Sequence, residues 1–237
     1  MKPTDFVLLV RSPAAGRVKR RLAAGIGDGH AAALYKAFVA DILETFFGAR
    51  VVPTVCYHPP EAGAAVRQWL GDRYPYLAQR GRDHPGRLRC AFEDLFARGI
   101  GKVVIVASDN PDLPGGILLE AREALNKSEA VLGPTLDGGY YLIGFRREAF
   151  VPEAFSDIDW STGRVFGQTM AIIQAAGRSL AVLPQWSDVD TPGDLLALAS
   201  RGSASLFRGS LTIKYLRQHP EILCRNGREK GGRGKGA

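Results

Sequence analysis

KVVIVASDNPDLP, residues 102–114, is the stretch of sequence that decides the fold. Residues 103–107 are apolar and mostly β-branched, which is typical of a strand buried on both faces of a parallel sheet. Pro111 cannot extend a strand ladder, so this strand must end before it. We therefore expect Asp109 and Asp112 at the carboxyl edge of a sheet, where open α/β sheets bind their ligands.

This pair of carboxylates predicts a metal site. Two carboxylates about 4 Å apart repel each other by roughly 4 kcal/mol at an effective dielectric constant of about 20. A divalent cation removes that repulsion, and carboxylate oxygens are the ligands that Mg²⁺ and Mn²⁺ prefer. The structural alternative is that Asp109 caps a turn and that Asp112 is a solvated loop residue.

Length and composition indicate an ordinary globular protein. The chain has 237 residues, of which 46% are hydrophobic and 23% are charged, so one or two domains are expected. No apolar run is long enough to cross a bilayer, and residues 6–10 are too short for the core of a signal peptide. The three cysteines are far apart and fit neither a disulfide framework nor a zinc site. These features predict a cytoplasmic protein with no membrane span.

The net charge of +7 is concentrated at the end of the chain. Residues 225–237 hold five cations against Glu229, so they carry four of the seven net positive charges. This segment is Gly-rich and has no apolar periodicity, which predicts disorder. A weak electrostatic role with RNA or a membrane is the alternative. No aromatic residues lie among these cations, so the pattern does not favour nucleic-acid binding.

A basic loop follows the first predicted strand, with the sequence RSPAAGRVKRRL at residues 11–22. Pro13 and Gly16 favour a tight turn, and the loop carries five cations within eleven residues. A Gly-containing loop that leads into a helix and is rich in cations suits a phosphate group. Its spacing is not that of a P-loop, and a basic surface turn is the alternative. We expect Lys19 to lie on the surface of this loop.

Strands alternate with helices along most of the chain, which predicts an α/β protein with a mainly parallel, doubly wound sheet. No G-x-G-x-x-G motif follows the first strand, which argues against a dinucleotide-binding dehydrogenase. The predicted strands are 6–10, 51–57, 76–79, 103–107, 130–133, 140–145 and 179–184. The predicted helices are 29–47, 61–70, 87–98, 115–126, 163–176 with Ser161 or Thr162 as its N-cap, a helix capped by Thr191, and 210–218.

Two later motifs carry further carboxylates. In GPTLDGGYYLIG, residues 133–144, the Asp137-Gly138-Gly139 turn permits a positive φ or the close approach of a ligand, and a hairpin turn is the alternative. In SDVDTPGDL, residues 187–195, Asp188 and Asp190 precede a predicted helix with Pro192 in its first turn. Either of these two carboxylates is a candidate metal ligand, and the alternative is a role in starting the helix.

Together with WST at residues 160–162, these motifs resemble one family, the nucleotide-diphospho-sugar transferase-like family catalogued as DUF2064. The resemblance covers residues 5–200 and implies a GT-A fold, which is a three-layer α/β/α fold with a Rossmann-like sheet. It also implies a nucleotide held by the first loop and Mg²⁺ or Mn²⁺ held near SDNPD. Some members are described as glycosyltransferases associated with arsenosugar biosynthesis. Residues 201–224 would be a helical extension beyond this domain.

The resemblance assigns roles residue by residue. Arg11 and Arg20 depart from the family pattern but keep or add positive charge. His84-Pro85 replaces the Leu-Gly that is usual in the family, and this departure concerns the specificity for the acceptor. The candidates are Pro13, Gly16, Arg17, Lys19 and Arg21 for the phosphates; Asp109, Asp112 and Asp190 for the metal; Asp109 and Asp137 for catalysis; and Gly138, Gly139, Tyr140 and Trp160 for the substrate.

The sequence therefore predicts a glycosyltransferase that moves a sugar from a nucleoside-diphospho-sugar to a small-molecule acceptor. A nucleotidylyltransferase that uses an NTP and a phosphorylated small molecule is the alternative, because a metal and cations also stabilise attack at an α-phosphate. The two activities differ in product, which is a nucleoside diphosphate in the first case and pyrophosphate in the second. A non-enzymatic binding protein that uses the basic tail is a third hypothesis.

Overall fold

The computed structural model describes residues 4–14 and 16–224. The predicted disordered tail, residues 225–237, lies outside the described residues. The chain divides into two compact units. Met1–Ser12 and Ile42–Asp188 form what we call the sheet unit, and Pro13–Asp41 and Val189–Ala237 form the helical unit.

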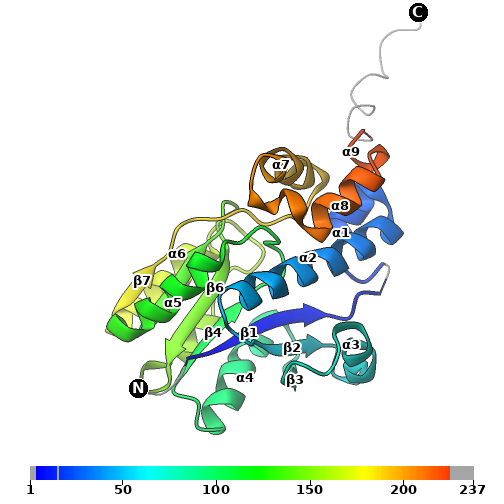
Figure 1. The fold of residues 1–237 in the computed structure, drawn as a ribbon. Coiled ribbons are helices and arrows are strands. Elements are labelled where there is room, and N and C mark those ends of the chain that lie inside the picture. The colour runs from blue at the N-terminus through cyan, green and yellow to red at the C-terminus, as the bar shows by residue number, and fades with distance from the viewer. Residues whose placement is uncertain (1–3, 15, 225–237) are drawn as a thin grey trace, which may run out of the picture. The chain divides into compact units, whose positions relative to one another are not determined.

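The sheet unit contains a seven-stranded sheet with the strand order β3-β2-β1-β4-β6-β5-β7 (Figure 1). Every neighbouring pair is parallel except the two pairs that include β6, so the prediction of a mainly parallel α/β sheet is confirmed. The strands are β1 (Thr4–Arg11), β2 (Thr54–His58), β3 (Tyr76–Ala78), β4 (Lys102–Val106), β5 (Ala130–Pro134), β6 (Tyr140–Arg146) and β7 (Leu180–Val182).

The apolar run of the deciding stretch forms β4, which lies between β1 and β6. All of its residues after Lys102 are buried, as expected for a strand covered on both faces. The strand ends at Val106, so Asp109 follows the carboxyl end of an interior strand, as predicted. The hairpin turn around Asp137, which the sequence offered as the alternative, is observed, because β5 and β6 pair antiparallel across that turn.

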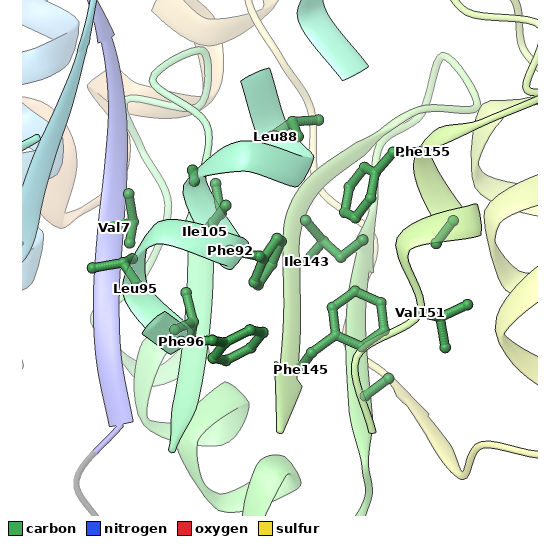
Figure 2. Packing of buried hydrophobic residues seen from close by; sticks show 14 of the residues in the cluster. Val7, Leu88, Phe92, Leu95, Phe96, Ile105, Ile143, Phe145, Val151 and Phe155 are labelled. Carbon is green, nitrogen blue, oxygen red and sulfur yellow. The ribbon is translucent and has the colours of Figure 1, made fainter. Parts of the chain in front are cut away.

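One face of this sheet packs against helix α4 (His84–Ala97) and part of α6 (Val165–Ala175). Phe92 and Phe96 of α4 meet Phe145 and Phe155 in an aromatic cluster, with Phe92 and Phe145 ring centroids 5.4 Å apart (Figure 2). Tyr140 and Trp160 pack against the same core. Fully burying each large apolar side chain contributes roughly 1.5–3 kcal/mol, so this core fixes the backbone that carries the substrate candidates.

The other helices of the sheet unit are close to their predicted positions. They are α3 (Gly63–Leu70) and α5 (Gly115–Lys127), with the C-terminal end of α2 (Asp28–Gly48). Phe46 in α2 meets Phe6 of β1 with ring centroids 6.0 Å apart. The predicted start of α6 is wrong, because the helix begins at Val165 and neither Ser161 nor Thr162 is its N-cap residue.

The helical unit contains α1 (Arg20–Ile26), the N-terminal part of α2, α7 (Pro192–Ser203), α8 (Leu211–Gln218) and α9 (Glu221–Cys224). Its core contains Leu22, Leu34, Phe38, Leu195 and Ile213. Thr191 caps α7 as predicted, and Asp194 completes a capping box. Residue 200, the expected end of the transferase-like domain, lies inside α7. Among the described residues, no helix has the length and apolar character that a membrane span needs.

Candidate functional site

Several polar residues of the sheet unit converge on the carboxyl edge of its sheet. Strands β1 and β2 run in parallel and end at Arg11 and His58, which are register partners. Strand β6 runs antiparallel to β4 and begins at Tyr140, so Tyr140 lies at the edge where β4 ends. The backbone N–H of Ala107 confirms this, since it donates to Tyr141 O at 2.9 Å. The edge that the sequence predicted for ligand binding therefore carries residues from four neighbouring strands.

The turn after β4 holds its polar side chains in fixed directions. Asn110 is fully buried and donates through Nδ2 to Ser187 O at 2.9 Å, whereas its Oδ1 has no partner among the described residues. Asp112 is half-buried and accepts a hydrogen bond from Trp186 Nε1 at 3.1 Å. This turn therefore offers two carboxylates and one buried amide oxygen without a donor. Such an oxygen-only set suits a hard divalent cation such as Mg²⁺ or Mn²⁺.

Asp137 stabilises its own turn. Its Oδ1 accepts hydrogen bonds from Thr135 Oγ1 at 2.5 Å and from the backbone N–H of Gly139 at 3.0 Å. Gly138 has a φ of 88°, as the sequence predicted for this turn, and a Cβ there would lie 2.2 Å from Gly163 O. Gly139 does not have a positive φ. The turn therefore requires glycine at position 138, and Asp137 lies exposed at its tip with Oδ2 outside these two hydrogen bonds.

The rings of Tyr140 and Trp160, two predicted substrate residues, form a chain of contacts with the ring of His84, which was not a predicted site residue. Tyr140 and Trp160 meet edge to face with centroids 6.2 Å apart, and Trp160 meets His84 at 5.6 Å in the same manner. The Tyr140 hydroxyl is buried and has no hydrogen-bond partner among the described residues. Burial raises the pKa of Tyr140, so the hydroxyl remains protonated and can donate.

His84 begins α4 and is surrounded by charged groups of the sheet unit. Desolvation by the surrounding protein, followed by the positive charges of Arg87 and Arg11, lowers the pKa of His84 to about 4. Asp109 and Asp83 act in the opposite direction but more weakly. His84 is therefore neutral at pH 7 and lies within electrostatic range of both arginines and of Asp109.

Two more cationic or polar side chains of this cluster are buried without partners. The Arg87 residue is 9% exposed, and its Nε has no hydrogen-bond partner among the described residues. Nδ1 of His58, at the end of β2, is likewise a buried atom with no hydrogen-bond partner among the described residues. Burial, with the positive charges of Arg87 and Arg11, lowers the pKa of His58, so this imidazole is also mainly neutral at pH 7.

The basic loop of the helical unit is arranged differently from our expectation. Lys19 is not a surface cation, because its side chain is 4% exposed and its Nζ lies 2.9 Å from Asp190 Oδ1. Arg21 adds a second contact, 3.7 Å from Asp190 Oδ2. Burial alone would raise the pKa of Asp190, but Lys19 and Arg21 outweigh it and hold that pKa below its usual value. Two candidates for different ligands, Lys19 and Asp190, are therefore paired with each other.

The remaining phosphate candidates lie around this ion pair. Gly16 has a φ of 74°, and the Arg17 N–H closes a turn by donating to Ala14 O at 3.0 Å. Arg17 and Arg21 are exposed, and Pro13 is half-buried. The loop leads into helix α1, as expected, although the sequence analysis gave no bounds for this helix. Exposed cations and a tight turn remain compatible with phosphate binding.

A different group of residues in the helical unit also has the donor atoms for a metal. His30, His219 and Glu221 each offer a ligand atom, and these atoms all lie within 4.8 Å of one another. His30 Nδ1 lies 2.8 Å from the Tyr215 hydroxyl, which orients the ring. No sequence motif pointed to these residues, because His30 and His219 are separated by most of the chain.

The structure thus brings together some predicted residues and separates others by unit. Within the sheet unit the edge holds Asp109, Asp112, Tyr140 and Trp160, with Gly138 and Gly139 in the turn before β6. Sequence reasoning missed His58 and Arg87 as site residues, and it linked His84 to the acceptor only as part of the His84-Pro85 departure from the family pattern. An arginine near the start of an amphipathic helix gives no sign in the sequence that it is buried.

Comparisons with known proteins match the fold of this chain. The model of a family described as "Uncharacterized protein conserved in bacteria (DUF2064)" matches residues 43–162. The crystal structure of a "putative nucleotide-diphospho-sugar transferase" from Desulfovibrio desulfuricans G20 has a TM-score of 0.89 and 35% sequence identity, covering 95% of this chain and 98% of that chain. No curated protein is similar enough in sequence to match this chain.

More distant structures share the fold alone. A 4-diphosphocytidyl-2C-methyl-D-erythritol synthase has a TM-score of 0.54 and 16% identity, covering 84% of this chain and 97% of that chain. Rv0371c from Mycobacterium tuberculosis H37Rv, solved in complex with manganese, has a TM-score of 0.52 and 18% identity, covering 84% of this chain and 98% of that chain. At such identities the likeness concerns the arrangement of strands and helices.

Proposed function

Because the chain belongs to the DUF2064 family and has the fold of a nucleotide-diphospho-sugar transferase, we propose that it transfers a sugar from a nucleoside-diphospho-sugar to a small-molecule acceptor. That the chain is a transferase follows from these relatives. The choice of glycosyl transfer is our proposal. The observation that carries it is the position of Asp109, which follows the central strand at the sheet edge and lies within electrostatic range of His84.

Asp109 and Asp112 would hold a divalent metal on the diphosphate. The unpartnered buried Oδ1 of Asn110, between them in sequence, supports an oxygen-rich site in this turn. When bound, the metal would supply Lewis acidity that stabilises the negative charge developing on the leaving group. Trp186 restricts the rotation of the Asp112 carboxylate through its hydrogen bond, which reduces the entropy lost on binding.

Within the helical unit, the candidates for binding phosphate are the exposed residues Gly16, Arg17 and Arg21 of the basic loop, together with Pro13. Lys19 would not contact the phosphates directly, since its side chain is buried and paired with Asp190. The same pairing neutralises Asp190, which weakens its candidacy as a metal ligand. We propose that this ion pair positions Arg21, which also lies near Asp190, rather than contacting the nucleotide itself.

The turn of Asp137 would serve the sugar. Its Oδ1 is engaged in two hydrogen bonds, so Oδ2 is the oxygen that would accept a hydrogen bond from a sugar hydroxyl or remove a proton. The backbone at Gly138 and Gly139 carries no side chain that would obstruct a ligand. Tyr140 and Trp160 would contact the substrate from the beginning of β6 and from the segment before α6.

The test is a titration of nucleoside diphosphates and nucleotide-sugars, with and without Mn²⁺, on wild type and Asp109→Asn. Asparagine keeps the shape and a capping oxygen but removes the anionic attraction for a cation. We expect Mn²⁺-dependent affinity to fall at least tenfold, which corresponds to about 1.4 kcal/mol, with an unchanged or slightly higher melting temperature because repulsion with Asp112 is relieved.

The matched control is Asp72→Asn, which removes an exposed carboxylate far along the sequence from the turn after β4. It should leave metal-dependent binding within about twofold of the wild type, since surface charges act weakly across solvent. Equal enhancement by Mn²⁺ in wild type and Asp109→Asn would contradict a metal site at Asp109. Release of pyrophosphate from an NTP, instead of a nucleoside diphosphate from a nucleotide-sugar, would favour the nucleotidylyltransferase alternative.

A further inference from the structure

The guanidinium of Arg87 is the least expected charge in the sheet unit. The Arg87 residue is 9% exposed, its Nε is buried without a hydrogen-bond partner, and its side chain forms no ion pair among the described residues. The nearest acidic residue in sequence, Asp83, is engaged as the cap of α4, where its Oδ1 accepts from Gly86 N at 2.8 Å. An unpaired buried charge is strongly unfavourable, so a folded protein that keeps one normally pairs it with something. For Arg87 that partner is not supplied by the described part of the chain.

Further groups with hydrogens to donate face the same region. Arg11 lies close enough to lower the pKa of Arg87 further, after burial, and both arginines act in the same way on His84. Nδ1 of His58, the register partner of Arg11, is buried and has no partner in the part of the chain that the structure describes. Two guanidinium groups in mutual range repel each other, and an anion between them reverses that repulsion. The cluster therefore has the composition of an anion site.

The cluster is held rigidly by the loop before α4. Gln79 Nε2 donates to Cys56 O at 2.8 Å, and this side chain is buried. Gly81 has a φ of 121°, and a Cβ there would lie 2.7 Å from Arg87 N, so the loop passes directly over the first turn of α4. These contacts fix the start of α4 before any ligand arrives, which lowers the entropic cost of binding.

We propose that Arg11, His58, His84 and Arg87 bind an oxyanionic group of the acceptor, a phosphate monoester or a carboxylate. This inference rests on the proposed transferase function and names the acceptor class: a small molecule that carries its own negative charge. Arginine forks match the oxygens of both groups, and the neutral imidazoles donate one hydrogen each. The buried Tyr140 hydroxyl, linked to His84 through Trp160, adds a further donor near the acceptor.

An acidic acceptor explains why the cluster lies at the same edge as Asp109. A negatively charged acceptor is repelled by the carboxylates of the metal turn and by the diphosphate of the donor. The guanidinium groups of Arg11 and Arg87 offset that repulsion and fix the orientation of the acceptor relative to the donor. Neutral acceptors, such as simple sugars, do not need this arrangement.

The experiment measures binding of inorganic phosphate and of acetate by calorimetry and thermal unfolding, on wild type and Arg87→Met. We expect Arg87→Met to keep or raise the melting temperature in the absence of anions, because it removes an unpaired buried charge. It should lower phosphate affinity at least tenfold. The matched control is Arg89→Met on the same helix, which removes an exposed arginine that is paired with Glu93 at 3.2 Å and should leave phosphate affinity within twofold.

A second variant covers the possibility that Arg87→Met fails to fold. His84→Gln replaces a residue in the first turn of α4 and should lower phosphate affinity at least threefold with the fold intact. Unchanged phosphate affinity in either folded variant overturns the proposal. Preferential binding of phosphate would identify a phosphorylated acceptor, and preferential binding of acetate would identify a carboxylic acid.

Repeating the phosphate titration at saturating nucleoside diphosphate and Mn²⁺ separates this proposal from the proposed function. Persistence of phosphate binding supports a distinct acceptor site, whereas its abolition would assign the cluster to the nucleotide phosphates and overturn the acceptor assignment. If no nucleotide binds but phosphate binds and Arg87→Met abolishes that binding, the anion site stands and the nucleotide-sugar proposal fails.

Discussion

The basic loop of the helical unit and the polar cluster at the sheet edge differ in whether their buried cation is paired with a carboxylate. In the loop, buried Lys19 is neutralised by Asp190 at 2.9 Å. In the cluster, Arg87 is also buried but has no such partner among the described residues. The loop is dense in cations along the sequence, whereas the cluster collects its two cations, Arg11 and Arg87, from two separate segments. Burial without a partner, rather than the number of cations in a segment, therefore identifies the stronger candidate for a ligand site.

The two regions also differ in how tightly their turns are packed. Gly138 at the sheet edge and Gly16 in the loop both have a positive φ. A Cβ at position 138 would lie 2.2 Å from Gly163 O, whereas a Cβ at position 16 would meet nothing nearer than 3.4 Å. The substrate turn is thus fixed by its neighbours, and the basic loop has room to accommodate a change.

The largest expected effect is that of Gly138→Ala. The added methyl group must displace neighbouring backbone, and the alanine must adopt a left-handed backbone conformation. Together these two effects should cost about 3 kcal/mol. For a chain of this size that lowers the melting temperature by roughly 6–12 °C. Thermal unfolding is the measurement, and Gly16→Ala is the matched control at about 1 kcal/mol, since only its φ is unfavourable. Equal losses in the two variants would show that packing does not distinguish the turns.

A smaller loss of stability is expected for Lys19→Met. The change leaves Asp190 without its closest cation, but the Asp190 side chain is 35% exposed, so water compensates in part. The expected cost is about 2 kcal/mol, between the values for surface pairs and buried pairs. Chemical denaturation of Lys19→Met, Asp190→Asn and the double variant would give the coupling between the two residues.

The control for this cycle is Arg17→Met, which removes an exposed cation of the same loop and should change stability by less than about 0.5 kcal/mol. The direction of the stability change in Lys19→Met and in Arg87→Met is the sharper test. Lys19→Met should destabilise the protein and Arg87→Met should not, although both remove a buried positive charge. Destabilisation of the same size by both variants would mean that Arg87 has a partner in the protein, and the contrast between the two regions would disappear.

The smallest expected effect concerns a buried carboxylate of the helical unit. Both oxygens of Asp41 accept backbone hydrogen bonds, from Leu211 N at 2.8 Å and from Thr212 N at 2.9 Å. Burial nevertheless raises the pKa of Asp41, because desolvation outweighs these bonds. The stabilisation linked to its proton is therefore complete below the unfolded pKa of about 4 and is lost as the pH rises through the folded value.

Asp41→Asn removes that titration while keeping one accepting oxygen. The melting temperature of wild type relative to Asp41→Asn should therefore be higher at pH 4 than at pH 7, by a small margin. Thermal unfolding of both proteins at the two pH values measures it, with Asp72→Asn as an exposed control that should show no such trend. A constant difference between the wild type and Asp41→Asn would mean that the pKa of Asp41 is not raised.

Much of the fold could be predicted because its signals are local. The run of apolar residues after Lys102 fixes β4, and Asp137-Gly138 fixes the return from β5 to β6. Thr191 and Asp194 specify the start of α7 through a capping box whose members are three residues apart. The start of α6 could not be predicted in this way, since polar candidates at 161 and 162 precede a helix whose N-cap residue, Arg164, makes no side-chain cap.

The candidate site was predictable only in the parts that follow directly from the strands. Asp109 and Tyr140 lie where β4 ends and β6 begins, so their edge was determined once those strands were recognised. Lys19 was misjudged because its partner Asp190 is 171 residues away. His58 and Arg87 gave no usable signal, since a histidine at the end of a strand and an arginine in a helix are normally solvated.

The sequence by itself determined the α/β class, the strand that delivers Asp109 and the turn at Gly138, because each depends on residues within a few positions of one another. Tertiary structure decided which charges are satisfied. Pairing between Lys19 and Asp190, and the lack of a partner for Arg87 among the described residues, depend on which side chains folding brings within a few ångströms. Electrostatic energy depends on that distance and on burial rather than on separation along the chain, so only the folded protein distinguishes a neutralised cation from one that is available to a ligand.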